Sequence, residues 1–164
     1  MTITLIAALD RRQAIGYQGQ LLFHIPADMR RFKALTMGHT LIMGRRTFES
    51  LPHGALPGRR NIVLSRQQGA AWPRTEVFGS FAEALQACTP DEQIFVIGGA
   101  TVYAEAMPLA HRLCLTHIDA EAPRADVFFP QFNPDDWNVA HTETHESDTG
   151  GVPAYCFTDY VRKG

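Results

Sequence analysis

Short apolar strands alternate with helical segments through most of this chain, and this alternation limits the folds that are open to it. Strands are expected at Ile3–Leu9, Thr40–Met43, Asn61–Ser65, Glu76–Phe78, Gln93–Ile97 and Arg112–Ile118. Helices are expected over 26–37, 44–51, 80–88 and 99–107. Pro26 is suited to begin a helix, because its missing N–H would have no partner in the first turn. Strands that alternate with helices form a mostly parallel sheet with helices on both faces.

The last part of the chain has a different pattern. Trp137–Glu146 and Ala154–Arg162 flank a Gly150-Gly151 turn without a helical pattern between them, which predicts an antiparallel hairpin at one edge of the sheet. We therefore expect an α/β fold of three layers. It should have a mostly parallel central sheet of about eight strands, the C-terminal antiparallel hairpin and about four flanking helices.

Asp10–His24 carries Gly16 and Gly19 and shows little periodicity, which predicts a long loop. Loops of this length inside a compact domain are usually lids or binding loops. The chain has 164 residues, so we expect one domain over residues 1–164.

Several classes of protein are not expected from the sequence. No apolar run approaches the ~20 residues that span a bilayer, and the N-terminus resembles a strand rather than a signal peptide. Cys88, Cys114 and Cys156 are far apart and form no CxxC pair, so we expect reduced thiols in or beside apolar segments. These features together favour the cytoplasm.

Basic and acidic residues are concentrated in different parts of the chain, although its formal net charge is only −2. Acids dominate between Asp119 and Asp148, where Arg124 is the only base apart from histidine. Such blocks indicate either a solvated face or, for the basic one, a bound anion. Nucleic acid is a weaker candidate, because the whole chain has no excess of basic residues. The basic block has a net charge of +7 and contains, with the single acid Glu49, the residues Arg30, Arg31, Lys33, Arg45, Arg46, Arg59, Arg60 and Arg66.

Asp28 has two interpretations. Asp28, Phe32 and Leu35 share one stripe of the helix that begins at Pro26. Asp28 could be a surface acid that complements the helix dipole. It could instead be a lone carboxylate at the mouth of an apolar pocket, where desolvation raises its pKa and makes it useful in proton chemistry. The spacing leaves both interpretations open.

Glycines or arginines directly follow several of the expected strands. Gly98-Gly99 separates an apolar strand from a helix, which indicates either a structural turn or a close approach to an anionic ligand. The full GxGxxG motif is absent, so the standard dinucleotide fold is not supported. Gly44-Arg45-Arg46-Thr47 and Ser65-Arg66 repeat the pattern at other strand ends. Taken together, these segments favour a cofactor that carries phosphate.

His141, Glu143 and His145 alternate and would share one face of a strand. They could be metal ligands, but no further ligand is near in sequence. The exposed face of an edge hairpin explains them better, and no metal site is expected.

Eight sequence blocks occur in the order and spacing of dihydrofolate reductases, and the chain resembles this family from Ile3 to Phe157. Within the family it is most similar to the chromosomal bacterial form. The blocks are LIAALDRRQAIGYQGQ, IPADMRRFKALTMGHTLIMGRRTFESLP, LPGRRNIVLS, IFVIGGATVY, LTHIDAE, DVFFP, NPDDW and AYCF.

The resemblance implies a substrate site centred on Asp28, which matches the family's carboxylate for the pterin 2-amino group and N3. Thr116 matches the threonine that supports this contact. Arg59 matches the arginine that pairs with the α-carboxylate of the glutamate tail. Phe23 stands where bacterial members commonly have a tryptophan whose N–H holds a water, and Phe23 has no such donor. Other positions that match the folate pocket are Ile6, Ala8, Met29, Phe32, Ser50, Leu51 and Leu56.

The resemblance also implies an NADPH site, with residues 39–91 as an approximate adenosine-binding subdomain. Gly98-Gly99 matches a cis Gly-Gly bond of the family. Positions that match the nicotinamide surroundings are Ala8, Ile15, Gly16 and Ile97. Positions that match phosphate contacts are Arg45, Arg46 and Thr47, and those near the adenosine 2′-phosphate are Ser65 and Arg66. Leu64 is a further expected cofactor-binding position. The helix start beneath the pyrophosphate supplies Ala100, Thr101, Val102 and Tyr103.

As a member of this family, the chain is expected to be an NADPH-dependent oxidoreductase that reduces 7,8-dihydrofolate to 5,6,7,8-tetrahydrofolate. Hydride reaches pterin C6, N5 is protonated, and Asp28 acts through electrostatics and an ordered water. One alternative is an NADPH-dependent pyrimidine reductase of riboflavin synthesis, against which Asp28 and Arg59 argue. Another is a non-catalytic protein that binds NADPH or antifolates. The expected partners are dihydrofolate and antifolate inhibitors, without nucleic acid or membrane, and the family default is a monomer.

Overall fold

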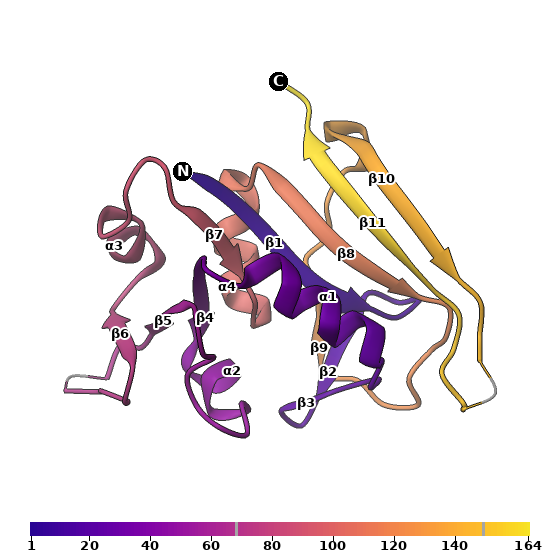
Figure 1. The fold of residues 1–164 in the computed structure, drawn as a ribbon, viewed down its shortest axis with the longest axis horizontal. Coiled ribbons are helices and arrows are strands. Elements are labelled where there is room, and N and C mark those ends of the chain that lie inside the picture. The colour runs from indigo at the N-terminus through magenta and orange to yellow at the C-terminus, as the bar shows by residue number, and fades with distance from the viewer. Residues whose placement is uncertain (68, 149) are drawn as a thin grey trace.

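The centre of the structure is a mixed β-sheet with the C-terminal hairpin at one edge (Figure 1). The computed structural model describes residues 1–67, 69–148 and 150–164, and over these residues the central sheet has eight strands. In chain order they are β1 (Thr2–Leu9), β4 (Thr40–Gly44), β5 (Arg60–Leu64), β6 (Thr75–Phe78), β7 (Gln93–Val96), β8 (Arg112–Ile118), β10 (Trp137–His145) and β11 (Tyr155–Arg162).

The order of the strands is β10-β11-β8-β1-β7-β4-β5-β6. From β8 to β6 every neighbouring pair is parallel, whereas β11 is antiparallel to both β8 and β10. The carboxyl ends of the parallel strands therefore meet at one edge of the sheet, which is where open α/β sheets bind ligands. In Figure 1 this is the lower edge, where α2 (Arg45–Glu49) follows β4.

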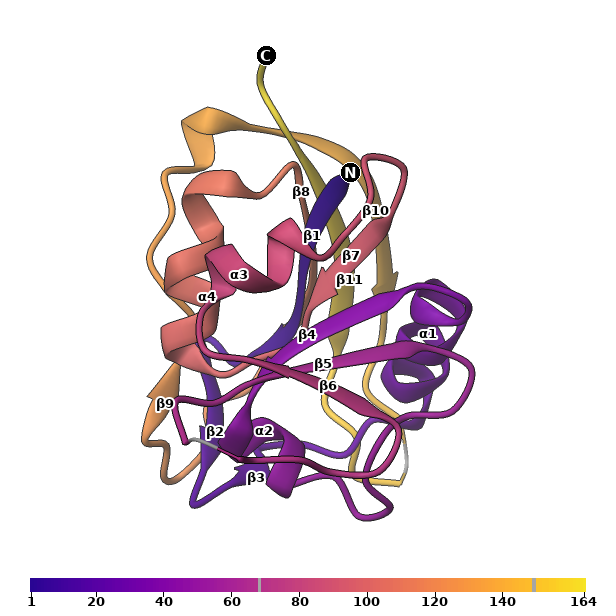
Figure 2. The ribbon, with the colours of Figure 1, turned by 90° about the vertical axis from the view of Figure 1, so that its left-hand side faces the viewer.

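Helices cover both faces of the sheet, with α1 (Pro26–Thr36) on one side and α3 (Phe81–Gln86) and α4 (Ala100–Ala106) on the other (Figure 2). Pro26 occupies the first position of α1, as its sequence position predicts. Ser80 caps α3, because its hydroxyl accepts a hydrogen bond of 3.1 Å from the Glu83 N–H. The described residues also contain the 3₁₀ turns η1 (Met107–Leu109) and η2 (Pro134–Asp136).

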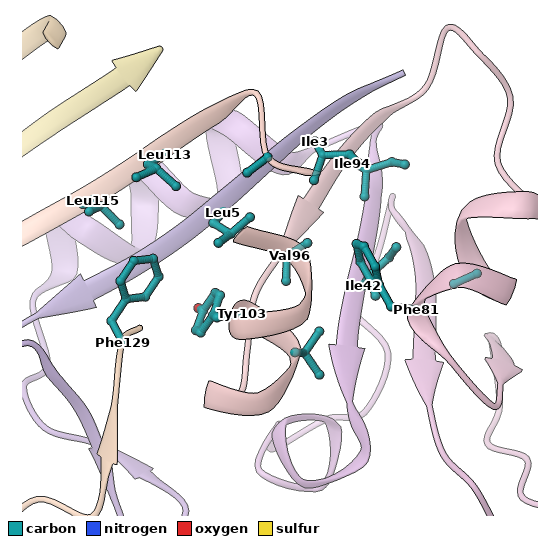
Figure 3. Packing of buried hydrophobic residues seen from close by; sticks show 14 of the residues in the cluster. Ile3, Leu5, Ile42, Phe81, Ile94, Val96, Tyr103, Leu113, Leu115 and Phe129 are labelled. Carbon is teal, nitrogen blue, oxygen red and sulfur yellow. The ribbon is translucent and has the colours of Figure 1, made fainter. Parts of the chain in front are cut away.

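Each face of the sheet has its own apolar core, because successive side chains of a strand point to opposite faces. Leu5 and Val96 pack with Tyr103 between the sheet and α4 (Figure 3). On the opposite face, Ile6 and Phe95 pack in a second cluster with Phe32 of α1. The predicted α/β fold is confirmed, and the predicted ends of its elements lie within two residues of the observed ones.

The segment Asp10–His24 is not the plain loop that its sequence predicts. It contains β2 (Ala14–Tyr17) and β3 (Gln20–Leu21), and β2 also pairs with β9 (Val127–Phe128) in a small antiparallel sheet. These strands are too short to show a period in sequence, and β9 lies more than a hundred residues along the chain from β2. The segment is thus held in place by a distant partner.

The edge strand β10 carries His141, Glu143 and His145. His141 and Glu143 are exposed, and the half-buried His145 ring stacks on Tyr155 with 4.9 Å between the ring centroids. The interpretation of these residues as part of an edge hairpin is confirmed. Within the described ranges, no cluster of three or more His, Cys, Asp or Glu side chains could hold a metal ion.

The cysteines lie in or beside the cores. Cys114 is buried, Cys88 and Cys156 are half-buried, and all three are free thiols. No helix among the residues described is long and apolar enough to cross a membrane.

Candidate active site

Asp28 lies in the first turn of α1 and faces the sheet. Its Oδ1 accepts a hydrogen bond of 2.5 Å from the hydroxyl of Thr116, which is only 2% exposed on β8. The pKa of Asp28 is raised above its ordinary value, because the effect of burial is larger than the opposing effects of the Thr116 hydrogen bond and the positive charge of Arg31. Asp28 therefore occupies a partly desolvated position rather than a solvated surface.

Apolar side chains surround this carboxylate on the α1 face of the sheet. Ala8 of β1 is in register with Thr116, and Ala8 and Phe23 pack against Ile25, Ile118 and Phe157. Two of the expected pocket residues do not join these clusters, because Met29 is 48% exposed and Ser50 is exposed at the end of α2. A second apolar group on the same face contains the expected residues Ile6, Phe32, Leu51, Leu56 and Ile97.

Arg59 contacts Thr36, the last residue of α1, at the opposite end of the helix from Asp28. Its Nη1 donates to the Thr36 hydroxyl over 3.2 Å and its Nε donates to the Pro57 carbonyl over 3.0 Å. Thr36 is eight residues after Asp28, which corresponds to about 12 Å along a helix. The Asp28 carboxylate and the Arg59 guanidinium suit a long ligand that presents hydrogen-bond donors to Asp28 at one end and a carboxylate to Arg59 at the other.

Two helix starts lie side by side at the carboxyl edge of the sheet. The N–H of Gly44 donates to the Gly98 carbonyl over 2.9 Å, which joins the end of β4 to the segment after β7. Gly44 precedes α2 and Gly99 precedes α4, and neither of these N-cap residues makes a side-chain capping bond. The Gly98-Gly99 peptide is cis, as the family resemblance implies. Uncapped N–H groups at helix starts favour bound anions.

Glycine at position 98 has a steric reason. A Cβ at Gly98 would lie 3.0 Å from the Thr47 hydroxyl oxygen, and Gly98 has φ +134°, a region that side chains disfavour. Thr47 of α2 therefore packs directly against the Gly98-Gly99 segment. This close approach builds one continuous surface from two strand ends.

The expected arginines flank this surface. Arg45, Arg46 and Arg66 are exposed, and the Arg45 Nε lies 3.2 Å from the Glu49 carboxylate. Ser65 follows β5 directly, and its N–H donates to the Phe78 carbonyl over 3.0 Å. Leu64, in contrast, packs against the core on the α4 face.

Two of the expected residues at the start of α4 have side chains that are buried in the core. Val102 is 7% exposed and Tyr103 is 3% exposed, because both side chains pack into the core. The Tyr103 hydroxyl donates to the Ile6 carbonyl over 2.7 Å. Burial, together with the nearby Asp28 carboxylate, raises the pKa of Tyr103, so its hydroxyl stays neutral. Ala100 is half-buried and Thr101 is exposed.

Ile15 and Gly16 lie on β2, where Ile15 packs against the core. Asp126 holds this strand, because its carboxylate accepts a hydrogen bond of 3.0 Å from the Gln18 N–H and its own N–H donates to the Gly16 carbonyl. Asp10 holds the beginning of the same segment from a buried position. It accepts three backbone hydrogen bonds, from Arg12, Ala14 and Ala122.

Sequence reasoning missed Asp10 and Asp126. An aspartate directly after a buried strand, such as Asp10, is a recognisable signal for a side chain that bonds the following turn. Asp126 gives no comparable signal, because its partners are more than a hundred residues away.

The basic block is not one surface, because two of its arginines pair with acids from other parts of the chain. The Arg31 guanidinium is 2.6 Å from the Asp159 carboxylate. Arg60 is 2.6 Å from Glu76 and 2.9 Å from Glu92. These partners neutralise part of the block and lie 16 to 128 residues away from the arginines in sequence.

The carboxyl edge of the sheet fits a cofactor that carries phosphate, because it combines uncapped helix starts, a glycine surface and exposed arginines. Asp28 and its apolar surroundings lie on the adjoining α1 face. An α/β enzyme that binds an anionic nucleotide and a second, elongated ligand is the class that this fold and site define.

Comparisons with known proteins agree with this class. The sequence profile of the dihydrofolate reductase family matches residues 2–162. The dihydrofolate reductase of Neisseria gonorrhoeae is 40% identical over 163 residues, which cover 99% of each chain. The type 3 dihydrofolate reductase of Salmonella typhimurium is 45% identical over 148 residues, or 90% of each chain.

A solved structure of Enterococcus faecalis dihydrofolate reductase, complexed with NADP(H) and RAB-propyl, superposes with a TM-score of 0.90. It is 31% identical and covers 99% of this chain and 97% of its own. The chain belongs to the dihydrofolate reductase family. The family resemblance seen in the sequence is thereby confirmed.

Proposed function

We propose that this dihydrofolate reductase holds the pterin ring of 7,8-dihydrofolate at Asp28 and holds NADPH along the carboxyl edge of the sheet. The reaction is the NADPH-dependent reduction of dihydrofolate to 5,6,7,8-tetrahydrofolate, the cofactor of one-carbon metabolism. The observation that carries the assignment is the desolvated Asp28 carboxylate, which is hydrogen-bonded to Thr116 and surrounded by apolar residues.

Substrate orientation follows from the two ends of α1. The Asp28 carboxylate can accept hydrogen bonds from the pterin 2-amino group and N3. Arg59, whose guanidinium is aimed by Thr36 and Pro57, can pair with the α-carboxylate of the glutamate tail. The apolar side chains Ile6, Phe32, Leu51 and Leu56 lie on the same face and would exclude water from the ring between these two anchors.

The cofactor has matching positions on this chain. The N–H groups at the starts of α2 and α4 suit the phosphates, as do Arg45, Arg46 and Thr47. Ser65 and Arg66 suit the adenosine 2′-phosphate, and residues 39–91 then form the adenosine-binding part of the domain. Ala8, Ile15, Gly16 and Ile97 suit the nicotinamide surroundings.

NADPH, when bound, supplies the hydride that pterin C6 accepts. The chain's contribution is to hold the ring and to favour a proton at pterin N5. The negative charge of Asp28, in a site of low dielectric, stabilises a positive charge on the bound ring. Phe23 packs against Ile25 and Ile118 and has no donor, so it cannot hold a water near Asp28 as a tryptophan N–H would.

The activity is tested by following the absorbance of NADPH in the presence of dihydrofolate. We expect oxidation of NADPH that depends on dihydrofolate and yields tetrahydrofolate. A folded protein that binds NADPH but does not oxidise it with dihydrofolate would contradict the proposal. The pyrimidine substrate of riboflavin synthesis is the control substrate, and it should not be reduced.

Arg66→Ala tests the position of the 2′-phosphate. A hydrogen bond to a charged group contributes about 1.5–3 kcal/mol, so NADPH should bind roughly tenfold or more weakly. NADH lacks this phosphate, so its affinity should change little. Arg124→Ala removes another exposed arginine, from the segment between β8 and β9, and should affect neither cofactor. Dissociation constants from fluorescence titration give the comparison, and equal losses for NADPH and NADH would exclude the assigned role of Arg66.

The same site is the proposed target of antifolate inhibitors, which would compete with dihydrofolate for Asp28. We also propose that the enzyme acts as a monomer in the cytoplasm. The free thiols of Cys88, Cys114 and Cys156 agree with a reducing compartment.

A further inference from the structure

Arg31 lies one helical turn after Asp28 and is held away from it by β11. The Arg31 guanidinium sits over the Phe157 ring, 4.6 Å from the ring centroid, and its Nη2 is 2.6 Å from Oδ1 of Asp159. The side chains of Arg31 and Asp159 are only 17% and 20% exposed. This contact is therefore a half-buried, hydrogen-bonded ion pair rather than a solvated surface pair.

The partners of Arg31 and Asp28 occupy one small area of the sheet. Phe157 of β11 is in register with Thr116 of β8, and Asp159 is in register with Cys114. Residues two apart on a strand share a face, so all four side chains lie on the α1 face. Helix α1 thus rests on this area through two polar contacts, Asp28 with Thr116 and Arg31 with Asp159.

Arg31 has an alternative partner. Residues three apart on a helix are neighbours, so an arginine at position 31 can reach a carboxylate at position 28. An ion pair between them would occupy the carboxylate oxygens that a pterin ring needs. Asp159 competes for the same guanidinium, and Phe157 supplies a ring face on which a guanidinium stacks well.

We propose that Asp159 is a positioning residue that holds Arg31 over Phe157, prevents Arg31 from pairing with Asp28 and so keeps the carboxylate free for the substrate. This inference rests on the proposed role of Asp28. Arg31 remains near enough to act on Asp28 through its charge, and Asp159 sets how strong that action is.

Among the described residues, few other titratable groups lie near Asp28. Tyr103 of α4, on the opposite face of the sheet, has a pKa raised by burial and by Asp28, so it is neutral. Burial and the Asp159 carboxylate raise the pKa of Cys114 to about 12, so this thiol is neutral too. From β8, Thr116 only donates a hydrogen bond. Arg31 and, through it, Asp159 are then the charged side chains that set the electrostatic field at Asp28.

The test is an NMR titration of the Asp28 carboxyl carbon in the folded enzyme. Arg31→Met keeps the long stem but removes the charge, so the pKa of Asp28 should rise by about one pH unit. Asp159→Asn releases Arg31 toward Asp28, so the pKa of Asp28 should fall by a similar amount. Arg30→Met, a charge removal at an exposed position of the same helix, should leave the titration almost unchanged.

The double variant Arg31→Met/Asp159→Asn distinguishes an effect of Asp159 that acts through Arg31 from a direct interaction between the Asp159 and Asp28 carboxylates. Loss of the Asp159 charge would itself lower the pKa of Asp28 if the two carboxylates interacted directly. In the Arg31→Met background, the proposal predicts that Asp159→Asn no longer changes the pKa of Asp28. A fall that persists in this background would overturn the proposal, as would a pure loss of thermal stability without any change in titration.

Steady-state kinetics provide a second measurement. In Asp159→Asn the released arginine competes with the pterin, so KM for dihydrofolate should rise several-fold more than kcat falls. Arg31→Met should abolish that increase in the double variant. If Asp28→Asn proved fully active, the proposed function of Asp28 would be wrong. If Asp28→Asn were inactive but Asp159→Asn had normal KM, only the present inference would be wrong.

Discussion

Asp28→Asn should reduce kcat/KM for dihydrofolate roughly thirtyfold or more, because truncating one partner of a buried charged pair costs about 2–5 kcal/mol. The amide keeps the shape of the carboxylate but offers one acceptor where the carboxylate offers two. It also lacks the negative charge that favours a proton on the bound ring. NADPH binding should not change, because the proposed phosphate positions of the cofactor lie at the ends of β4, β5 and β7.

The same substitution should not destabilise the fold at neutral pH. Burial raises the pKa of Asp28 in the folded protein, so the folded state holds the proton to a higher pH than the unfolded state does. The wild-type carboxyl therefore lowers stability progressively as the pH rises from the ordinary aspartate range through the raised pKa. The amide that replaces it carries no charge in this range, so the variant should become more stable relative to the wild type as the pH rises.

Thermal unfolding at several pH values, together with steady-state kinetics, tests both effects. Asp135→Asn makes the same chemical change at an exposed position in η2 and should alter neither activity nor stability. An Asp28→Asn enzyme with wild-type kcat/KM would remove Asp28 from the mechanism. A large loss of stability at neutral pH would instead indicate that the carboxylate is chiefly structural.

Much of the fold could be predicted from the sequence because its signals are local. Pro26, Gly38 and Ser80 mark helix ends by their own conformational preferences, and the apolar strands identify themselves by composition. The glycines at the strand ends could also be recognised in the sequence. Gly98 has a positive φ and lies close to the Thr47 side chain, and both features favour glycine.

The features that the sequence could not provide depend on distant partners. The sequence left two environments open for Asp28, because its hydrogen-bond partner Thr116 lies 88 residues away. The pairing of two arginines of the basic block could not be predicted, because Arg31 and Asp159 are 128 residues apart and Arg60 is separated by 32 residues from Glu92. In the same way, strand β2 could not be predicted, because it depends on pairing with the distant strand β9. Charge runs in sequence therefore overestimate the charge that a folded surface presents.

Gly98→Ala should weaken NADPH binding by about tenfold or more and also destabilise the fold. An alanine here must adopt φ +134° and place its Cβ 3.0 Å from the Thr47 oxygen, so backbone strain and a steric conflict add together. A residue forced into a sparsely populated backbone region costs about 1–3 kcal/mol, which would lower Tm by roughly 2–12 °C for a domain of this size. To relieve the contact, the Thr47 side chain or α2 must give way by a few tenths of an ångström, which would disturb the proposed phosphate site between the two helix starts.

Gly99→Ala is the matched control at the neighbouring position. Gly99 has φ −89°, and its added Cβ would lie 3.7 Å from the Thr47 oxygen, which is an ordinary contact. This variant should keep nearly wild-type stability and lose less NADPH affinity than Gly98→Ala. Thermal unfolding and cofactor titration of both variants give the comparison. Equal effects at the two positions would show that the space between Thr47 and Gly98 does not control the cofactor site, whereas a loss confined to Gly98→Ala would locate that control at the contact between α2 and the end of β7.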